Sequence, residues 1–246
     1  MDINNHILLL LILLPIAAFL YASVGHGGAS SYLVLLTLFD FVSTEIRPAS
    51  LLLNTAVSGA SFLLFRKASD FPKKLFLSLI LFSVPASFIG SMFLLDDKIY
   101  QKILGILLLF PTMRLLNLFP VNKSKLIERK FWMAPVLGFL IGLVSGLIGI
   151  GGGIILSPIL LFLGWTDSKQ TASVSALFIF LNSLSGIIGS GVFNFSLPSH
   201  FGMILPLTLI GGIAGGYLGA NKFNIPAMRI VLANVLAIAS IKFIFQ

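Results

Sequence analysis

The chain of 246 residues contains no cysteine, and only 10% of its residues are charged. The absence of cysteine excludes disulfides, thiolate metal sites and cysteine nucleophiles. The low charge, together with 57% hydrophobic residues and a mean hydropathy of +1.06, excludes a soluble globular protein. At about 20 apolar residues for each helical crossing, the length corresponds to roughly eight to ten helical segments. We therefore expect an all-α integral membrane protein without a soluble nucleotide-driven domain.

Apolar runs bounded by glycine, proline and charge give the positions of the expected helices. They cover residues 7–24, 28–41, 47–65, 74–95, 99–119, 131–148, 153–164, 170–191, 201–220 and 225–245. The runs 28–41 and 153–164 are too short to span a bilayer comfortably, and each follows a glycine cluster. Whether these two segments cross or re-enter is left open. The expected fold is a polytopic helical bundle with glycine-broken short helices.

The 16 Lys and Arg against 8 Asp and Glu give a net charge of +8, which in a soluble protein suggests nucleic acid as a partner. Here most basic residues fall in links on one side of the expected membrane, which the positive-inside rule places in the cytoplasm. The residues on that side are Arg66, Lys67, Lys73, Lys74, Arg114, Lys123, Lys125, Arg129, Lys130, Lys169, Lys222 and Arg229. Arg47, Lys98, Lys102 and Lys242 remain outside. The excess charge therefore indicates topology rather than nucleic-acid binding, and both termini are predicted outside.

The same count predicts two halves of opposite orientation, because each half contains an odd number of net crossings. We divide the chain into a first transmembrane repeat at 1–120, a basic cytoplasmic linker at 121–130 and a second repeat at 131–246. Residues 25–29 read Gly-His-Gly-Gly-Ala and residues 149–153 read Gly-Ile-Gly-Gly-Gly. Further along, Ala49-Ser50 parallels Ala172-Ser173, and Asn54 with Ser58 parallels Asn182 with Ser185, although the offset drifts.

Glycine turns of this kind expose successive backbone N–H groups, and the helix that follows adds its dipole. Two such breaks in equivalent places predict an anion site near the midplane of the bilayer. The alternative is close helix packing through small residues. The candidate substrate-binding residues are Gly25, His26, Gly27, Gly28, Gly149, Gly151, Gly152, Gly153, Asn54, Ser58, Asn182, Ser185 and Arg47.

Several of these side chains allow a second interpretation. His26 is suited to a proton relay, or it is merely solvated if its turn lies near the surface. Arg47 either captures the anion or forms a local ion pair at the interface. Asn54, Asn182 and the neighbouring Ser183 either line a cavity or join helices by hydrogen bonds. Trp165 is predicted to be an interfacial anchor.

At these residues the chain resembles the TauE/SafE family of sulfite exporters, which includes toluene-sulfonate uptake permeases. The resemblance rests on the turn 25–28, its recurrence at 149–153, the basic central link, and the Ala-Ser and Asn/Ser-rich helices that follow each turn. It covers essentially the whole chain. The resemblance implies secondary transport of sulfite, a sulfonate or a related sulfur-containing or organic anion across a bacterial inner membrane. His26 stands where the second motif has Ile150, so the two halves are not expected to bind identically.

We therefore expect a secondary transporter of a small anion that works by alternating access, with proton coupling as a hypothesis that rests on His26. An anion channel built from two re-entrant hairpins is the alternative. An intramembrane enzyme is not expected, since the apolar core holds too few ionisable groups. The expected partners are the anion, protons as the coupling ion and membrane lipids, without nucleic acid, metal or cofactor. The oligomeric state is left open, with a homodimer as one option.

Overall fold

The computed structural model describes residues 3–39, 41, 43–93, 132–191, 197, 198 and 200–221, with isolated residues between 99 and 113 and between 237 and 241. Every regular element in these ranges is an α-helix. The helices are α1 (Ile3–Ala22), α2 (Ala29–Leu38), α3 (Ser43–Phe65), α4 (Lys73–Ser91), α6 (Met133–Ile148), α7 (Gly153–Phe162), α8 (Ser168–Gly189) and α9 (Phe201–Asn221). Their positions confirm eight of the predicted apolar runs. The predicted runs 99–119 and 225–245 and the linker 121–130 lie largely or wholly outside the described residues.

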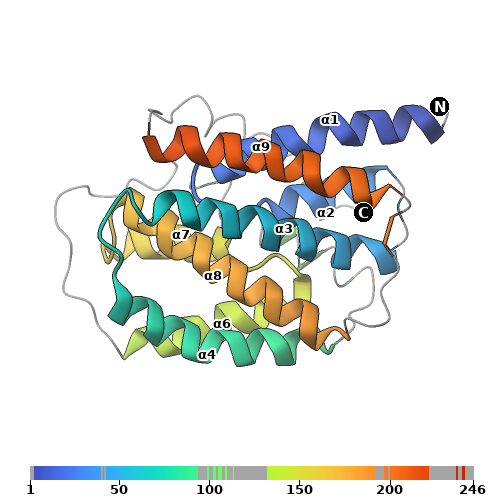
Figure 1. The fold of residues 1–246 in the computed structure, drawn as a ribbon. Helices are drawn as coiled ribbons and strands as arrows, with labels where there is room; N and C mark the ends of the chain where they lie inside the picture. Colours follow the sequence, from blue (N-terminus) through green and yellow to red (C-terminus); the bar gives the residue numbers. More distant parts are fainter. Residues whose placement is uncertain are drawn as a thin grey trace.

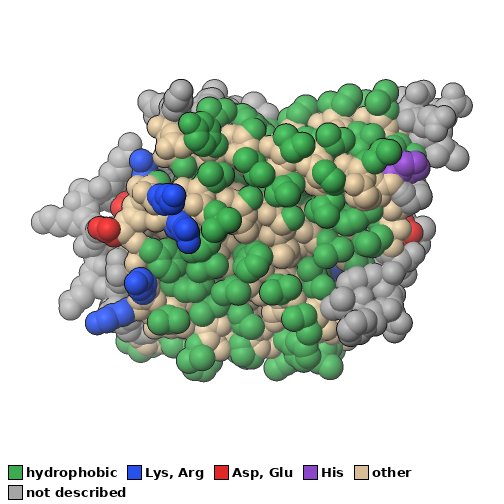
Figure 2. All heavy atoms as spheres, in the orientation of Figure 1, with side chains coloured by type: hydrophobic (Ala, Val, Ile, Leu, Met, Phe, Trp, Pro, Cys, Tyr) green, Lys and Arg blue, Asp and Glu red, His purple; other side chains and the backbone are tan. Residues whose placement is uncertain are grey.

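The described helices match the dimensions of a bilayer. Four of them, within α3, α4, α8 and α9, are long and apolar enough to cross a membrane. Figure 2 shows hydrophobic side chains over most of one face of the molecule, with Lys and Arg gathered at one end. At that end α3 finishes and α4 and α8 begin, with exposed Arg66, Lys67, Lys73, Lys74 and Lys169. A lipid-facing apolar surface with a basic end is typical of a multi-pass membrane protein.

The long helices form three layers, with α1 beside α9, α3 beside α8, and α4 beside α6 (Figure 1). The central pair contacts both outer layers, since α3 packs on α9 and α8 packs on α4. The short helices belong to the middle of the bundle, where α2 packs on α3 and α7 packs on α8. These contacts are the same in both halves if α1 is matched with α6, α3 with α8, and α9 with α4. The described helices thus form two matching series.

Both outer layers are held by close parallel contacts at glycine. Three glycines of α9 lie against carbonyl groups that are four residues apart: Gly211 at Pro15 and Gly215 at Phe19 in α1, and Gly219 at Ser23 directly after it. Three glycines of α6 lie against successive carbonyl groups of α4: Gly138 at Leu79, Gly142 at Ser83 and Gly146 at Ser87. In both pairs the residue numbers rise together, so the paired helices run parallel. A side chain at these positions would overlap the neighbouring backbone, which is the reason for glycine.

The central pair runs antiparallel. Asn54 of α3 hydrogen-bonds Ser183 of α8, whereas Gly59, further along α3, faces the earlier Phe180. The contacts of Gly212 at Val57 and of Asn182 at Ser83 align α9 with α3 and α8 with α4. Therefore α1, α3 and α9 run one way, and α4, α6 and α8 run the other way. Each helix of the second series is inverted relative to its counterpart in the first, as the charge distribution predicts.

The two short helices are half-length elements that return toward the face from which the preceding helix came. Because α1 and α3 run in the same direction, the chain between them must turn back, and α2 is this return. Ala29 at its start contacts Asn54 near the centre of α3. In the second half, Gly153 at the start of α7 lies against Ile179 near the centre of α8. Both short helices therefore begin in the middle of the bundle and end toward opposite faces.

Candidate functional site

The chain breaks between α1 and α2 and between α6 and α7 are built from glycines with left-handed backbone conformations. Their φ angles are 79° at Gly25 and 101° at Gly28 in the first break. In the second break they are 83° at Gly149, 71° at Gly151 and 75° at Gly152. Residues with a Cβ rarely adopt such angles. The conformation, and not only close packing, therefore requires glycine in both motifs.

Each break leaves helix N-terminal N–H groups in the interior of the bundle. The N-cap residues Gly28 and Gly152 provide no side-chain cap. Asn54 Oδ1 accepts from Ala29 N at 3.1 Å. Within the described part of the chain, no group accepts a hydrogen bond from the next N–H groups of α2 or from the first N–H groups of α7. These groups belong to Ser30, Ser31, Gly153 and Ile154. Buried helix starts of this kind are suited to an anion.

Asn54 joins the two breaks. Its Oδ1 binds the start of α2, while its Nδ2 donates to Ser183 Oγ at 2.8 Å and makes a long 3.5 Å contact with Ile150 O. Asn54 is only 1% exposed. The amide has no spare rotation here, because its acceptor and donor ends face groups of opposite kind. Asn54 is therefore one of the residues through which the two halves meet at the site.

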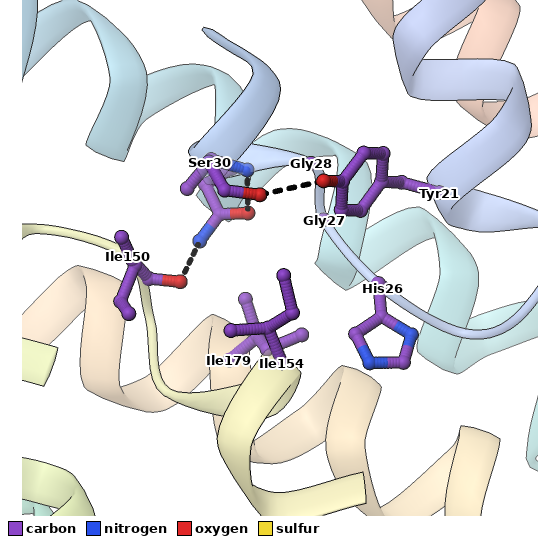
Figure 3. Close-up of a pocket in the computed structure, with 10 residues that line it drawn as sticks. Tyr21, His26, Gly27, Gly28, Ser30, Ile150, Ile154 and Ile179 are labelled. Atoms are coloured by element: carbon purple, nitrogen blue, oxygen red, sulfur yellow. Dashed lines mark hydrogen bonds between the residues drawn. The ribbon is translucent and has the colours of Figure 1, made fainter. Parts of the chain in front are cut away.

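A cavity of about 10 Å³ lies between the breaks, which is about the room that one water molecule needs. Its lining residues are Tyr21, His26, Gly27, Gly28, Ala29, Ser30, Asn54, Ile150, Ile154 and Ile179. The polar side chains all come from the first half, and the second half contributes isoleucines (Figure 3). The small cavity therefore has one polar and one apolar wall.

His26 points from the first break toward the second half of the chain. Its Nδ1 lies 3.1 Å from Val24 O, and its Nε2 lies 3.0 Å from Ser157 Oγ on α7. The ring is partly exposed, but it is held at both nitrogens. The structure thus places His26 in a contact between the halves and not on a solvated outer surface.

Two tyrosines that the sequence analysis missed hold the first break in shape. Tyr32 Oη donates to Gly27 O at 2.5 Å, and Tyr21 Oη lies 2.7 Å from Ser30 Oγ. Both rings are buried. The available signal was their rarity, since the chain has 4 tyrosines and two of them flank the Gly-His-Gly-Gly motif.

Arg47 lies at the ends of two helices. Its guanidinium donates to Ser91 O at 3.2 Å, to Phe93 O at 3.4 Å and to Gly146 O in a short contact. These carbonyl groups belong to the C-terminal ends of α4 and α6, where a positive charge is favourable. The aliphatic part of Arg47 packs beside Gly149. Arg47 therefore contacts the ends of α4 and α6 directly through their carbonyl groups.

Three other candidates do not reach the breaks. Ser58 Oγ donates to Asn54 O in its own helix at 2.6 Å. Asn182 Nδ2 donates to Ser83 Oγ at 3.1 Å, and Ser185 Oγ donates to Val84 O at 2.7 Å. Asn182 and Ser185 thus join α8 to α4. Ser183, the neighbour of Asn182 in the sequence, faces the second break at Gly151.

The breaks also reveal which residues are equivalent in the two halves. Gly25 packs against Ala172, whereas Gly149, its counterpart, packs against Arg47. Gly27 packs against Asn54, and Gly151 packs against Asn54 as well as against Ser183 and Ile179 of α8. The contacts of Gly25 and Gly149 make Arg47 the counterpart of Ala172, and the same offset of 125 residues makes Ile179 the counterpart of Asn54. This register differs by three residues, almost one helical turn, from the alignment that pairs Asn54 with Asn182.

Trp165 corrects another expectation. It is 3% exposed and packs in a cluster with Leu75, Leu160 and Phe178. The prediction of an interfacial anchor is therefore wrong, since an anchor of that kind exposes its ring to the lipid headgroups. Trp165 lies in the turn after α7, and side chains of α4, α7 and α8 cover its ring.

Comparison with known proteins agrees with this architecture. The family model described as "Sulfite exporter TauE/SafE" matches residues 9–243. "Probable membrane transporter protein y4hK" of Sinorhizobium fredii is 29% identical over 94% of this chain and 95% of its own length. "Probable membrane transporter protein YunE" of Bacillus subtilis is 28% identical over 91% of this chain and 93% of its own length.

A plant relative shares a shorter region. "Sulfite exporter TauE/SafE family protein 6" of Arabidopsis thaliana is 44% identical over 55 residues, which is 22% of this chain and 13% of the relative. No solved structure matches the chain. Because the family model covers nearly the whole sequence, the chain belongs to the sulfite exporter TauE/SafE family of membrane transporters.

Proposed function

We propose that the chain is a secondary transporter that binds a small oxyanion between the N-termini of α2 and α7. The observation that carries this proposal is the meeting of two buried helix starts, in which the N–H groups of Ser30, Ser31, Gly153 and Ile154 lack acceptors in the described structure. Each helix start carries about half a positive elementary charge. Neither short helix contains a charged residue, so the dipoles and N–H groups provide the attraction.

The family and the names of the relatives support sulfite, a sulfonate or a related organic anion as the substrate. Within the cavity, the oxyanion lies at the polar wall formed by the first half, near Ser30 and Asn54. Any carbon-bearing part of the substrate faces the isoleucines of the second half. The asymmetry of the lining supports this orientation, since N–H and amide groups bind oxygen atoms whereas isoleucine does not.

Transport proceeds by alternating access, in which one inverted half moves against the other. The described cavity has room for about one water molecule, so binding of a larger anion requires movement of the breaks. The inverted helix directions support such a movement. When two inverted halves exchange their conformations, the site opens to the opposite side of the membrane. Residues 1–120 and 131–246 are the moving units, joined by the linker 121–130.

The membrane is the bacterial inner membrane, with both termini outside and the basic end of the bundle in the cytoplasm. The exposed basic residues at the starts of α4 and α8 support this orientation. His26 couples transport to protons, and its position between the two halves supports this role. We propose transport and not catalysis, in agreement with the names of the relatives.

Flux into proteoliposomes tests the proposal. Sulfite, sulfoacetate, an aromatic sulfonate and lactate are offered at several pH gradients to wild type, Gly27→Leu, Gly151→Leu and Gly202→Leu. A Cβ at Gly27 or Gly151 would collide with the amide of Asn54, whereas nothing lies within 4 Å of a Cβ at Gly202. We expect saturable flux of one anion in wild type and Gly202→Leu and none in the other two variants.

Two results would contradict the proposal. Unchanged flux in both break variants would show that the glycine turns are packing elements and not the binding site. Flux that does not saturate and shows no counterflow would instead favour the anion channel. Reconstituted amounts and size-exclusion profiles are compared first, so that loss of flux is not a loss of protein.

A further inference from the structure

Three side chains from three separate elements form one hydrogen-bonded chain across the two halves. His26 Nε2, in the first break, lies 3.0 Å from Ser157 Oγ on α7. Ser157 Oγ lies 2.6 Å from Ser175 Oγ on α8. Ser157 is 6% exposed and Ser175 is fully buried. Neither serine belongs to the candidate residues found from the sequence.

The other ring nitrogen determines the direction of this chain. Nδ1 of His26 lies 3.1 Å from Val24 O, which can only accept, so Nδ1 carries a hydrogen. In the neutral ring Nε2 is then an acceptor, and Ser157 donates to it. Ser157 Oγ in turn accepts from Ser175. All three groups are satisfied in only this order.

Protonation of the ring reverses the order without moving a heavy atom. The imidazolium donates from Nε2 to Ser157 Oγ, and Ser157 then donates to Ser175 Oγ. Hydroxyl groups serve both directions because each is donor and acceptor.

We propose that Ser157 and Ser175 are the proton-transfer partners of His26. This inference rests on the proposed proton-coupled transport. A proton from water on the Thr171 side of Ser175 adds to Ser175 Oγ, the hydroxyl proton of Ser175 moves to Ser157, and that of Ser157 moves to Nε2. Both serines end neutral, and the imidazole gains one proton and one positive charge.

The surroundings of the chain favour transfer along it. Apart from His6 at the far end of α1, the titratable residues of α1, α2 and α7 are Tyr21 and Tyr32, whose hydroxyls bind Ser30 and Gly27. On α8 the charged residues are Lys169 and, at its N-cap, Asp167, both exposed. No carboxylate of these elements competes for the ring.

Hydroxyl groups continue from Ser175 toward the basic end of the bundle. Thr171 lies one helical turn before Ser175 on α8, and its Oγ1 lies 2.7 Å from Thr166 Oγ1 and donates to Asp167 O at 2.6 Å. The chain therefore points from the cavity to the proposed cytoplasmic face. Because His26 belongs to the first half and both serines belong to the second, a rocking movement that separates the halves breaks the chain. Proton transfer is then possible in only one of the two access states.

The first test is ¹⁵N NMR of histidine-labelled protein, which needs no substrate. The chain has 3 histidines, and His26→Gln identifies the signal of His26. We expect an unprotonated Nε2 at high pH whose resonance shifts in Ser157→Ala but not in Ser173→Ala. Ser173 is the matched control, since it is fully buried on the same helix as Ser175 and its Oγ binds no group in the described residues. A protonated Nε2 at high pH, or a resonance unaffected by Ser157→Ala, would overturn the proposed order.

The second test is pH-dependent flux of sulfite in proteoliposomes. We expect Ser157→Ala and Ser175→Ala to reduce the proton-driven component about 100-fold, the lower end of what a positioned proton donor contributes, with little change in KM. Ser157→Thr keeps a hydroxyl and restores this component, which a purely structural role would not predict. If wild type carries the anion without any pH dependence, the relay is overturned and the transporter stands. If wild type carries no anion, the proposed function fails, whereas the NMR result still decides the hydrogen-bond order.

Discussion

Asn54 Nδ2 of α3 and Ser183 Oγ of α8 meet at 2.8 Å, where the central helices of the two halves run antiparallel. This hydrogen bond links the first series of helices to the second at the level where both short helices begin. The other end of the same amide holds Ala29 N, the first N–H of α2. Asn54 therefore fixes the geometry of the break and the contact between the halves at once.

We expect Asn54→Ala to lower the free energy of unfolding by about 1–3 kcal/mol, because it leaves the Ala29 N–H buried without an acceptor. Anion flux should fall even at temperatures where the variant is still folded, since the start of α2 loses its position. Thermal unfolding in detergent and flux in proteoliposomes measure the two effects. Thr55→Ala is the control, because Thr55 Oγ1 bonds only Leu51 O in its own helix. Equal effects of the two substitutions would contradict the role of Asn54.

The glycine contacts of the outer layers give a second prediction. We expect Gly142→Ala and Gly215→Ala each to destabilise the protein by about 1–3 kcal/mol, because a Cβ would overlap the backbone of Ser83 or of Phe19. Gly202→Ala is the matched control in α9, where a Cβ meets nothing within 4 Å. It should be neutral or stabilise by up to about 1 kcal/mol, because alanine is the better helix former.

Thermal unfolding of the three variants in one detergent decides this. A loss at Gly202 equal to that at Gly215 would mean that α9 tolerates no substitution anywhere and that the close contact with α1 is not the cause. A neutral result at both Gly142 and Gly215 would mean that the outer layers separate at little cost.

Run length predicted the helices well, because the thickness of a bilayer sets the length of apolar segments independently of tertiary contacts. The glycine motifs likewise predicted the position of both breaks, since few other residues adopt the positive φ angles seen at Gly28 and Gly152. The opposite directions of the halves followed from where the basic residues lie. These features depend on the chain locally or on the membrane, so the sequence alone carries them.

The register of the central helices was not predictable in the same way. The sequence pairs Asn54 with Asn182, whereas the structural register makes Ile179 its counterpart in the second half. The two registers differ by three residues, which is nearly one helical turn. The roles of Tyr21, Ser157 and Ser175 depend on contacts between elements far apart in the chain. A hydroxyl in an apolar run has the same appearance whether it bonds its own helix, as Ser58 does, or another element.

Arg47 distinguishes structural support from anion capture. We expect Arg47→Met to lower the free energy of unfolding by about 1.5–3 kcal/mol, because the carbonyl groups of Ser91 and Gly146 lose a charged donor. Arg47→Lys should recover part of this loss, since it keeps the positive charge but lacks the planar set of N–H donors of a guanidinium. Substrate affinity of the folded protein, measured by calorimetry, should change little. A tenfold loss of affinity at unchanged thermal stability would instead place Arg47 in the binding site.

The apolar wall of the cavity makes the last prediction. Ile179 stands where the first half has Asn54, it is 2% exposed, and it lines the cavity with Ile150 and Ile154. Ile179→Val removes one methyl group at a cost of about 0.5–1.5 kcal/mol, so the protein should still fold.

If the carbon-bearing part of the substrate rests on this wall, the flux of an aromatic sulfonate relative to sulfite should rise in Ile179→Val. Ile187 is also buried, at 5% exposed, and lies two turns further along α8 outside the cavity lining, so Ile187→Val should leave the ratio unchanged. The ratio is measured for both variants and wild type in the same vesicles, which cancels differences in reconstitution. A ratio that moves equally in both variants would assign the effect to loosened packing of α8, whereas a ratio that moves in neither would remove Ile179 from contact with the substrate.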